Sequence, residues 1–278
     1  MQNRYPIFIP TKNRWKTPLT IRAFDRIGAD YRIVIEEQQF REYSKIVPKE
    51  RILILPHRDK GLTVTRNWIW DYAQEQGYKR FWTFDDNISE FYRLNRNIKW
   101  RCYSPTFLAV IEDWVERYEN IPIAGMEYEL FVPRKGKTDP FRLNTRVYSN
   151  MLILTQAKNP GGEFYRNECF YNDDTDLCLR VLKDGWCTVL FQAFLANKVA
   201  SMSMKGGMTD YYEKTNKRLE FAQELVDKHP DVAKVVWKWN RWHHEVDYSG
   251  FQKNKLIRKE GLEISGGINN YGMVLQSL

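Results

Sequence analysis

The chain has 278 residues and is 43% hydrophobic, which is sufficient for a large core in one elaborated domain or two small ones. Its formal net charge of +8 suits a polyanionic partner, although many proteins without such a partner carry a similar excess. The sequence has no run of about 18 apolar residues, which excludes a membrane-spanning helix.

Two further features indicate the cell compartment. The first ten residues, MQNRYPIFIP, contain neither a long apolar region nor a small-residue cleavage site, so we expect no signal peptide. The cysteines lack C-x-x-C spacing; they are Cys102, Cys169, Cys178 and Cys187. This pattern indicates free thiols in a reducing cytoplasm and argues against a zinc site.

The first ninety residues alternate short apolar runs with helical segments. The predicted strands are 5–9, 31–35, 51–55 and 80–84, and the predicted helices are 17–28 and 63–77. Because the apolar runs do not alternate cleanly with polar residues, they predict a parallel sheet covered by helices on both faces. This is an α/β architecture of the nucleotide-binding type.

The second part of the chain is less regular. The predicted strands are 121–125, 150–155 and 186–191, the predicted helices are 173–185 and 211–228, and residues 133–146 are expected to form an exposed loop. The helix at 173–185 begins with acidic residues, which its dipole favours. The tail from residue 231 is rich in Trp and Lys.

The segment FDDN places Asp85 and Asp86 directly after the predicted strand 80–84. Ligands of open parallel sheets bind at the carboxyl ends of the strands. Two adjacent carboxylates repel each other unless a cation or hydrogen bonds compensate, and Mg²⁺ or Mn²⁺ bridging a diphosphate would do so. The alternative is a polar turn with solvated acids.

Three other segments are predicted to lie at the same sheet edge. FIPTKNR ends the first strand with a polar turn, VIEE ends the second strand with carboxylates, and GLTVTRN places Arg66 in the helix that leads to strand 80–84. Each has a simpler explanation as a surface loop or a helix cap. Their shared position makes them informative together.

These motifs resemble those of GT-A-fold glycosyltransferases. The FDDN segment followed much later by NDDTDLCLRVLKDGW (172–186) is similar to the family's E-D-x-x-L-x-x-R pattern, with Asp173 in place of the usual Glu. More narrowly, FIPTKNR, FDDN, KGGMTDYY and RWHHEVDYSGF resemble the TET-associated glycosyltransferases, a phage-borne family linked to sugar addition on hydroxymethylated pyrimidines in DNA. The resemblance covers roughly residues 5–210.

The resemblance implies a GT-A-like domain over residues 1–210, with a mostly parallel central sheet flanked by helices, and a helical, basic extension over 211–278. It implies a UDP-sugar donor (glucose or N-acetylglucosamine) and Mn²⁺ or Mg²⁺ as cofactor. The partner would be double-stranded DNA carrying a hydroxymethylated pyrimidine, with no membrane involved. The location would be the cytoplasm, that of the host cell if the protein is phage-encoded.

The donor site would be formed by residues from several segments. The implied nucleotide-sugar contacts are Pro10, Thr11, Arg14, Glu36, Arg66 and Asp85, with Lys205 in the glycine-containing segment SMSMKGGM facing the leaving diphosphate. Asp86 would be a metal ligand, although the departure from D-x-D leaves open whether Asp86 or Asn87 faces the cation. A late histidine would complete the metal shell: either His243 or His244, with a slight preference for His244. The alternative is a histidine on the surface or in the core.

Asp174, with Asp173 beside it, would form the catalytic pair. A carboxylate on the acceptor side must take the proton of the incoming hydroxyl while positive groups neutralise the departing diphosphate. A base so placed predicts inversion at the anomeric carbon. The alternative is that residues 173–176 merely cap a helix.

Basic residues are clustered in 93–101, 134–146 and 253–259, and KVVWKWNRWHH (234–244) interleaves them with tryptophans. Lys and Arg neutralise phosphates and exposed rings stack on bases, so these segments suit DNA. For the tryptophans we favour the core of a C-terminal helix, whereas for the basic segments DNA contact and a solvated surface both stay open. Two other functions stay open: a glycan or protein hydroxyl as acceptor, and a non-catalytic DNA-binding protein.

Overall fold

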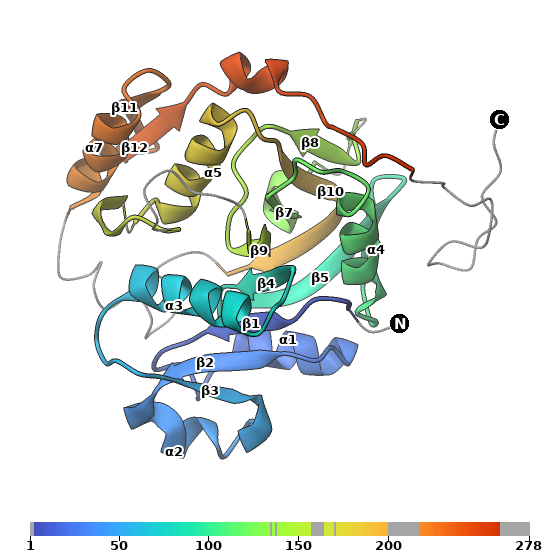
Figure 1. Ribbon diagram of the computed structural model, residues 1–278, viewed down its shortest axis with the longest axis vertical. Helices are drawn as coiled ribbons and strands as arrows, with labels where there is room; N and C mark the ends of the chain where they lie inside the picture. Colours follow the sequence, from blue (N-terminus) through green and yellow to red (C-terminus); the bar gives the residue numbers. More distant parts are fainter. Residues whose placement is uncertain are drawn as a thin grey trace.

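The computed structural model describes residues 3–133, 135–136, 138–156, 164–169, 171–199 and 217–261. At its centre is a ten-stranded mixed sheet of order β3-β2-β1-β4-β9-β7-β10-β5-β6, with β8 paired to β10 (Figure 1). The strands are β1 (Ile7–Pro10), β2 (Arg32–Glu36), β3 (Ile52–Leu55), β4 (Arg80–Phe84), β5 (Ile88–Asn95), β6 (Ile98–Arg101), β7 (Ile123–Tyr128), β8 (Phe141–Leu143), β9 (Asn150–Leu154) and β10 (Thr188–Lys198).

Most of the central strands share one direction. β3, β2, β1 and β4 pair in parallel, and β7 pairs in parallel with β10. β9 lies between β4 and β7 and is antiparallel to both, so β7 and β10 run in the same direction as β4. The predicted mixed α/β class with a mostly parallel central sheet is therefore confirmed.

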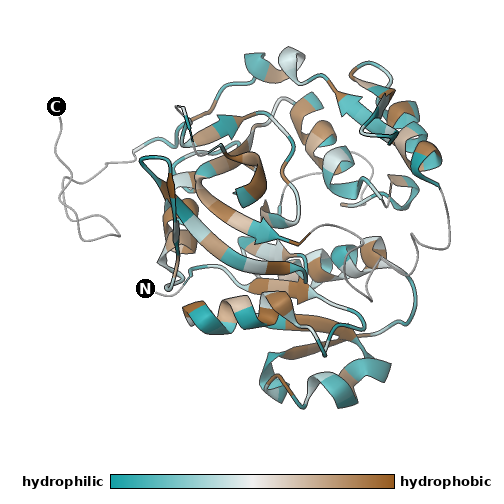
Figure 2. Cartoon of the chain, turned by 180° about the vertical axis from the view of Figure 1, so that it is seen from behind, coloured by the Kyte–Doolittle hydropathy of each residue, from teal (hydrophilic) through white to brown (hydrophobic). Residues whose placement is uncertain are grey.

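The helices cover both faces of the sheet. They are α1 (Leu19–Ile27), α2 (Phe40–Tyr43), α3 (Leu62–Glu75), α4 (Thr106–Val115), α5 (Asp173–Lys183) and α7 (Arg218–Lys228), with short 3₁₀ turns η1 (Glu37–Gln39), η2 (Lys49–Arg51), η3 (Glu129–Phe131), η4 (Asn167–Cys169) and η5 (Ser249–Lys253). Buried residues of α1 and α4 share one apolar cluster, and those of α3 and α5 share another. The apolar strands are thus enclosed between helix layers whose outer faces are polar (Figure 2).

A close approach between strands fixes the position of β9. Gly125 on β7 lies against β9, and a Cβ placed on it would be 2.1 Å from the Asn150 backbone oxygen and 2.5 Å from Val147 Cγ1. The Asn150 side chain accepts a hydrogen bond from the Met126 amide at 2.6 Å. These contacts hold the start of β9, which directly follows Ser149, a residue of the site described below.

The structure differs from the sequence predictions in the peripheral elements. The expected loop 133–146 contains β8, and the strand expected to end at residue 191 continues to Lys198. β5, β6 and α4 were not predicted. The boundary expected at residues 210 and 211 lies outside the described residues and stays a prediction.

Within the described part of the C-terminal extension, α7 is the only α-helix, and η5 adds a short 3₁₀ turn. Residues expected to continue as helix instead form a β-hairpin of β11 (Ala233–Lys238) and β12 (Arg241–Val246). β-branched and aromatic residues favour strands. Trp239 and Asn240 form the two-residue turn, with φ of 51° and 57°, the conformation that tight hairpin turns require.

The extension is attached to the body of the protein through α5. Phe251 packs in a small apolar cluster with Leu179 and Leu182 of α5 and Leu225 of α7. The side-chain amide of Asn254 donates to the backbone oxygens of Leu182 and Trp186, each at 2.8 Å. The hairpin is therefore carried on the same helix whose first turn contains Asp173.

Candidate active site

The three polar residues that follow β4 are held firmly by neighbouring elements. The Asp85 amide donates to the Ser149 backbone oxygen at 2.7 Å, and Thr20 Oγ1 donates to the Asp85 backbone oxygen at 2.7 Å. The Asn87 side-chain amide donates to the Val199 backbone oxygen at 3.3 Å. Asn87 is thus engaged with the backbone that follows β10.

Arg66 connects the two groups of acids that the sequence placed far apart. It is buried in the first turns of α3; its Nη2 donates to Asp85 Oδ1 at 2.9 Å, and its Nη1 donates to Asp173 Oδ2. The end of β4 and the start of α5 therefore meet at one guanidinium. Asp85 and Asp173, which are far apart in sequence, belong to one site.

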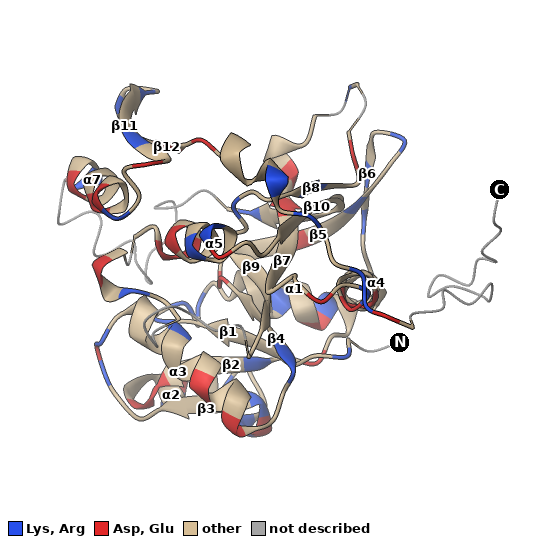
Figure 3. Cartoon of the chain, turned by 45° about the horizontal axis from the view of Figure 1, so that its top comes forward, with Lys and Arg blue, Asp and Glu red and all other residues tan. Residues whose placement is uncertain are grey.

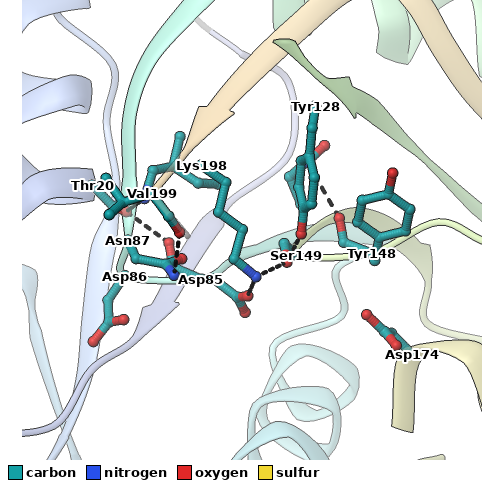
Figure 4. Close-up of polar contacts among 12 residues, drawn as sticks. Thr20, Asp85, Asp86, Asn87, Tyr128, Tyr148, Ser149, Asp174, Lys198 and Val199 are labelled. Carbon is teal, nitrogen blue, oxygen red and sulfur yellow. Dashed lines mark hydrogen bonds and ion pairs between the residues drawn. The ribbon is translucent and has the colours of Figure 1, made fainter. Parts of the chain in front are cut away.

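Lys198, at the end of β10, is a second cation on Asp85. Its Nζ donates to Asp85 Oδ2 at 2.9 Å and to Ser149 Oγ at 2.6 Å. Ser149 Oγ also shares a hydrogen bond with the Tyr128 hydroxyl at 2.5 Å. Figure 4 shows the Lys198 amine between Asp85 and Ser149, with Asp174 on the facing helix.

The charges of this group shift one another's pKa. Burial alone would raise the pKa of Asp85, but Lys198 and Arg66 hold it well below its usual range. Burial alone would lower the pKa of Lys198, and Asp85 raises it instead. Asp85 is therefore a carboxylate and Lys198 an ammonium over the whole neutral range.

Asp86 points to the other side, toward the end of β1. Its Oδ1 is paired with Arg14 Nη1, and its Oδ2 accepts a hydrogen bond from Thr11 Oγ1 at 2.8 Å. Thr11 Oγ1 also contacts the Tyr43 hydroxyl at 2.7 Å. Burial raises the pKa of Asp86, and Arg14 offsets this only in part.

The ends of the first two strands also lie at this edge. Pro10 is the buried last residue of β1, next to Thr11. Glu36, the last residue of β2, accepts hydrogen bonds from Lys12 Nζ and from the Asp59 amide, both at 2.9 Å. The predicted donor-site residues 10, 11, 14, 36, 66 and 85 thus all lie at the carboxyl ends of neighbouring strands or in the helix facing them.

Asp173 and Asp174 begin α5 in different surroundings. Asp173 is buried, and burial together with the neighbouring Asp174 charge raises its pKa to about 6 despite the contact with Arg66. Asp174 is less buried, and its Oδ1 accepts hydrogen bonds from the Thr175 amide at 2.7 Å and from Thr175 Oγ1 at 3.3 Å. Within the described part of the chain, Asp174 Oδ2 has no hydrogen-bond donor, so it is free to accept a proton.

The third acid of α5, Asp176, has a structural role. It is fully buried and pairs with His229 Nε2 at 2.9 Å, with Arg180 Nε at 3.0 Å and with Arg166. Burial would raise its pKa, but hydrogen bonds from His229 and Arg166 hold it well below the usual range. Asp176 therefore fixes α5 against α7 and against the segment that precedes α5.

Several residues around Asp174 were missed by the sequence analysis. Arg146 lies over the Tyr148 ring, 4.4 Å from its centroid, and is near enough to Asp174 for that carboxylate to raise the pKa of Arg146 against the effect of burial. Tyr148 donates a hydrogen bond to Glu127. Nothing in the apolar runs signalled Lys198 because the strand was expected to end earlier. Lys205, predicted at the diphosphate, lies outside the described residues.

The expected metal ligands do not form a cation site in this arrangement. Among the described residues, no three His, Cys, Asp or Glu side chains come together as a metal cluster. Each carboxylate oxygen of Asp85 and Asp86 already accepts a hydrogen bond from a cation or a hydroxyl. His244 stands on β12, where burial, Arg146 and His243 lower its pKa to about 4. The positive charge at this edge comes from Arg14, Arg66 and Lys198.

TarS 1–349 from S. aureus superposes with a TM-score of 0.43 at 11% identity, over 82% of this chain and 66% of that chain. The present chain thus spans slightly less than two thirds of that TarS chain. A complex of TarS 1–349 with UDP-GlcNAc gives 0.43 at 12% identity, covering 82% and 67%.

A nucleotide-diphospho-sugar transferase from Desulfovibrio desulfuricans G20 has a TM-score of 0.42 at 10% identity, over 82% of this chain and 99% of that one. No curated protein matches the sequence. The family model described as TET-associated glycosyltransferase matches residues 5–207, most of the chain. The chain therefore belongs to the TET-associated glycosyltransferase family.

Proposed function

We propose that this protein transfers a sugar from a UDP-sugar to the hydroxymethyl group of a 5-hydroxymethylated pyrimidine in DNA. 5-Hydroxymethylcytosine is the first base to test, and UDP-glucose and UDP-N-acetylglucosamine are the first donors. The observation that carries the proposal is the contact of Arg66 with both Asp85 and Asp173. It joins the strand ends at which nucleotides bind to the helix that presents Asp174.

The donor is proposed to bind at the carboxyl ends of β1, β2 and β4. Pro10, Thr11 and Arg14 would contact the uracil and ribose side, with Glu36 accepting hydrogen bonds from ribose or base. Asp85 would hold the ribose or the sugar, and Arg66 would reach the nucleotide. These residues already have fixed rotamers through their mutual contacts, which favours catalysis because little reorganisation is needed on binding.

The reaction is proposed to proceed by direct displacement. Asp174 Oδ2 takes the proton of the acceptor hydroxyl as that oxygen forms a bond to the anomeric carbon. The bond from the anomeric carbon to the phosphate oxygen breaks, and UDP leaves with the electron pair. Attack opposite the leaving group gives inversion, and NMR of the product showing a retained anomeric configuration would contradict this step.

A divalent metal, Mn²⁺ or Mg²⁺, is expected from the resemblance and stays a prediction. The side chains of Asp85 and Asp86 do not form a cation site by themselves, so no step above uses one. Positive charge for the leaving diphosphate is available on this edge from Arg14, Arg66 and Lys198. Rates of sugar transfer measured with EDTA, with Mn²⁺ and with Mg²⁺ show whether the charge of the leaving diphosphate is neutralised by a metal ion or by these side chains.

The DNA acceptor rests on the family to which the chain belongs and on its positive charge. The test is incubation of the protein with each UDP-sugar and a duplex carrying 5-hydroxymethylcytosine, followed by digestion and mass spectrometry of the nucleosides. We expect a hexose or N-acetylhexosamine mass added to the modified base, and none on a duplex with unmodified cytosine. UDP-sugar hydrolysis without a modified nucleoside would redirect the search to glycan or protein hydroxyls.

A further inference from the structure

The β11–β12 hairpin presents three tryptophans to solvent. The side chains of Trp237, Trp239 and Trp242 are 56%, 80% and 40% exposed. The sequence analysis favoured the core of a helix for these rings. In the structure they lie on a two-stranded hairpin that pairs with no other strand among the described residues and projects beyond α7 and α5 (Figures 1 and 3).

The tip of the hairpin has a conformation that is unfavourable for its own sequence. Trp239 has φ of 51°, in the left-handed region, where Gly and Asn are usual and a bulky side chain is an outlier. Asn240, with φ of 57°, suits that region. A large, exposed ring in a strained position is typical of a residue retained for contact with another molecule.

The rings are held in place before any partner arrives. Trp237 and Trp242 are directly opposite in the strand register, and their ring centroids are 5.0 Å apart in an edge-to-face arrangement. The Trp239 ring meets His243 edge-on, with the centroids 5.3 Å apart. Rigid aromatic side chains of this kind lose little conformational entropy on binding, which favours stacking.

The charges of the hairpin select the partner. Lys234, Lys238 and Arg241 are interleaved with the tryptophans, against the single acid Glu245, which pairs with both lysines. Arg241 donates a hydrogen bond to His243 Nε2 at 2.8 Å. Because this acceptor is not a carboxylate, the contact does not neutralise the arginine. An excess of cations beside exposed rings matches a nucleic-acid strand, whose phosphates are anionic and whose bases are flat.

The hairpin is also next to the proposed reaction centre. His244 on β12 is near enough to Arg146 for that guanidinium to lower the pKa of His244, and Arg146 in turn interacts with Asp174. Val246 at the end of β12 also packs against the apolar cluster of Leu179 and Leu182 on α5, so the hairpin is attached to the helix whose first turn contains Asp174. A second exposed aromatic, Trp100 on β6, is 57% exposed, but it lies on the outermost strand of the main sheet, and the cations on either side of it are already paired with acids, Lys99 with Glu129 and Arg101 with Glu90.

We infer that the β11–β12 hairpin binds the DNA strand that carries the acceptor base, with the Trp239 ring stacked on a base and the hairpin cations on the neighbouring phosphates. This rests on the proposed function for the identity of the acceptor. It adds which element recognises the DNA and how. If the base stacked on Trp239 is unpaired or displaced from the duplex, the target nucleotide can also leave the base stack and reach Asp174.

The test measures DNA affinity separately from sugar transfer. Fluorescence anisotropy with a labelled 5-hydroxymethylcytosine duplex compares wild type, Trp239→Ala, Trp239→Gly and the matched control Trp100→Ala. We expect Trp239→Ala and Trp239→Gly to weaken DNA binding by about tenfold or more, and Trp100→Ala to change it less than about twofold. Binding of the UDP-sugar, measured by calorimetry, should be unchanged in all variants.

Trp239→Gly adds a readout that a structural role would not give. Glycine adopts positive φ without strain, so the melting temperature of the Trp239→Gly variant should equal or exceed that of wild type, while its DNA affinity falls. A Trp239→Gly variant that binds DNA as tightly as wild type would overturn the inference. If DNA affinity is retained, sedimentation of wild type and variant and their binding to anionic vesicles show whether the hairpin contacts a second copy or a lipid surface instead.

The outcome also distinguishes this inference from the proposed function. If wild type transfers sugar to DNA but the Trp239 variants bind and react normally, the hairpin inference fails and the function stands. If the Trp239 variants lose DNA affinity but no donor ever modifies the DNA, the hairpin inference stands and the proposed transfer fails.

Discussion

Asp174 and its neighbour Asp173 show how two adjacent carboxylates acquire different properties. Asp173 is buried against Arg66, whereas Asp174 keeps one oxygen available at the surface of the site. The separation follows from the helix, because successive residues on an α-helix point in directions about 100° apart. In the proposed reaction, Asp174 rather than Asp173 is the carboxylate that would meet the incoming hydroxyl.

Replacing Asp174 with Asn should abolish most of the turnover without disturbing donor binding. The amide keeps the hydrogen bond from the Thr175 amide but cannot accept a proton, so kcat should fall by roughly 10²- to 10⁴-fold. Steady-state transfer assays and calorimetric titration with a UDP-sugar measure the two quantities. The control is Asp184→Asn, the same change at the exposed end of α5, which should leave both unchanged.

Asp173 should make a distinct contribution to the pH dependence of stability. Because burial and the neighbouring Asp174 raise the pKa of Asp173 to about 6 in the folded state, above its ordinary value, the folded protein binds this proton more tightly than the unfolded chain does. Its stabilising contribution is present below pH 4 and is lost as the pH rises to about 6. The loss amounts to about 1 to 3 kcal/mol.

Urea unfolding of wild type and Asp173→Asn across pH 4 to 7 checks this. The difference in the free energy of unfolding between the two proteins should change over that window in favour of the variant. A difference that is constant with pH would show that Asp173 titrates at its ordinary value.

The residues that could be predicted from the sequence are those placed by a strand end. Asp85 and Asp86 follow an apolar run that could only be a buried strand, and Glu36 follows another. Lys198 could not be predicted, because its position depends on β10 continuing through residues whose partner strand, β5, was itself not recognised. Ser149 and Arg146 lie in irregular backbone, where the sequence contains no periodic signal.

At the scale of elements, the sequence predicted those with a strong local pattern. The four parallel strands β1 to β4, with α1 and α3 between them, are near their predicted bounds. The hairpins β5–β6 and β11–β12 were missed, since their strands are half exposed and mixed with charges. A segment such as KVVWKWNRWHH has helix-compatible and strand-compatible residues, and only the two-residue turn at Trp239 and Asn240 decides between them.

The contact between β7 and β9 leaves no space for a side chain at Gly125. Gly125→Ala would place a Cβ at 2.1 Å from the Asn150 backbone oxygen, so the strands would have to separate. We expect a loss of about 1 to 3 kcal/mol in the free energy of unfolding. Because Ser149 directly precedes β9 and contacts Lys198, turnover should fall as well.

The measurement is urea unfolding of Gly125→Ala beside Gly250→Ala. A Cβ at Gly250 meets no atom within 4 Å, so this control should leave stability within about 0.5 kcal/mol of wild type. Equal effects at the two positions would contradict the close packing of β7 on β9.

On the scale of the whole molecule, the charge of +8 is distributed unevenly. Much of the basic run 93–101 is neutralised internally, because Lys99 pairs with Glu129 and Arg101 pairs with Glu90. Among the described residues, no helix is long and apolar enough to cross a membrane. The proposed DNA contact therefore draws on cations other than Lys99 and Arg101, among them those of the hairpin.

Salt should weaken DNA binding accordingly. Each phosphate contact that releases a counterion contributes to the slope of log Kd against log salt, so we expect the Kd to rise roughly tenfold or more between 50 and 200 mM NaCl. Anisotropy titrations at several salt concentrations give the slope. A Kd that is flat over this range would argue against DNA as the acceptor and in favour of an uncharged one.

The guanidinium of Arg66 has a further consequence for motion. It is buried between Asp85 on one side and Asp173 on the other. A hinge motion that moved α5 away from β4 would leave the buried Arg66 charge without one of its carboxylate partners. Loss of a partner from a buried ion pair destabilises proteins by about 3 to 5 kcal/mol. The spacing between the end of β4 and the start of α5 is thus set by this bridge, and an opening that admits the proposed acceptor would take place in other elements.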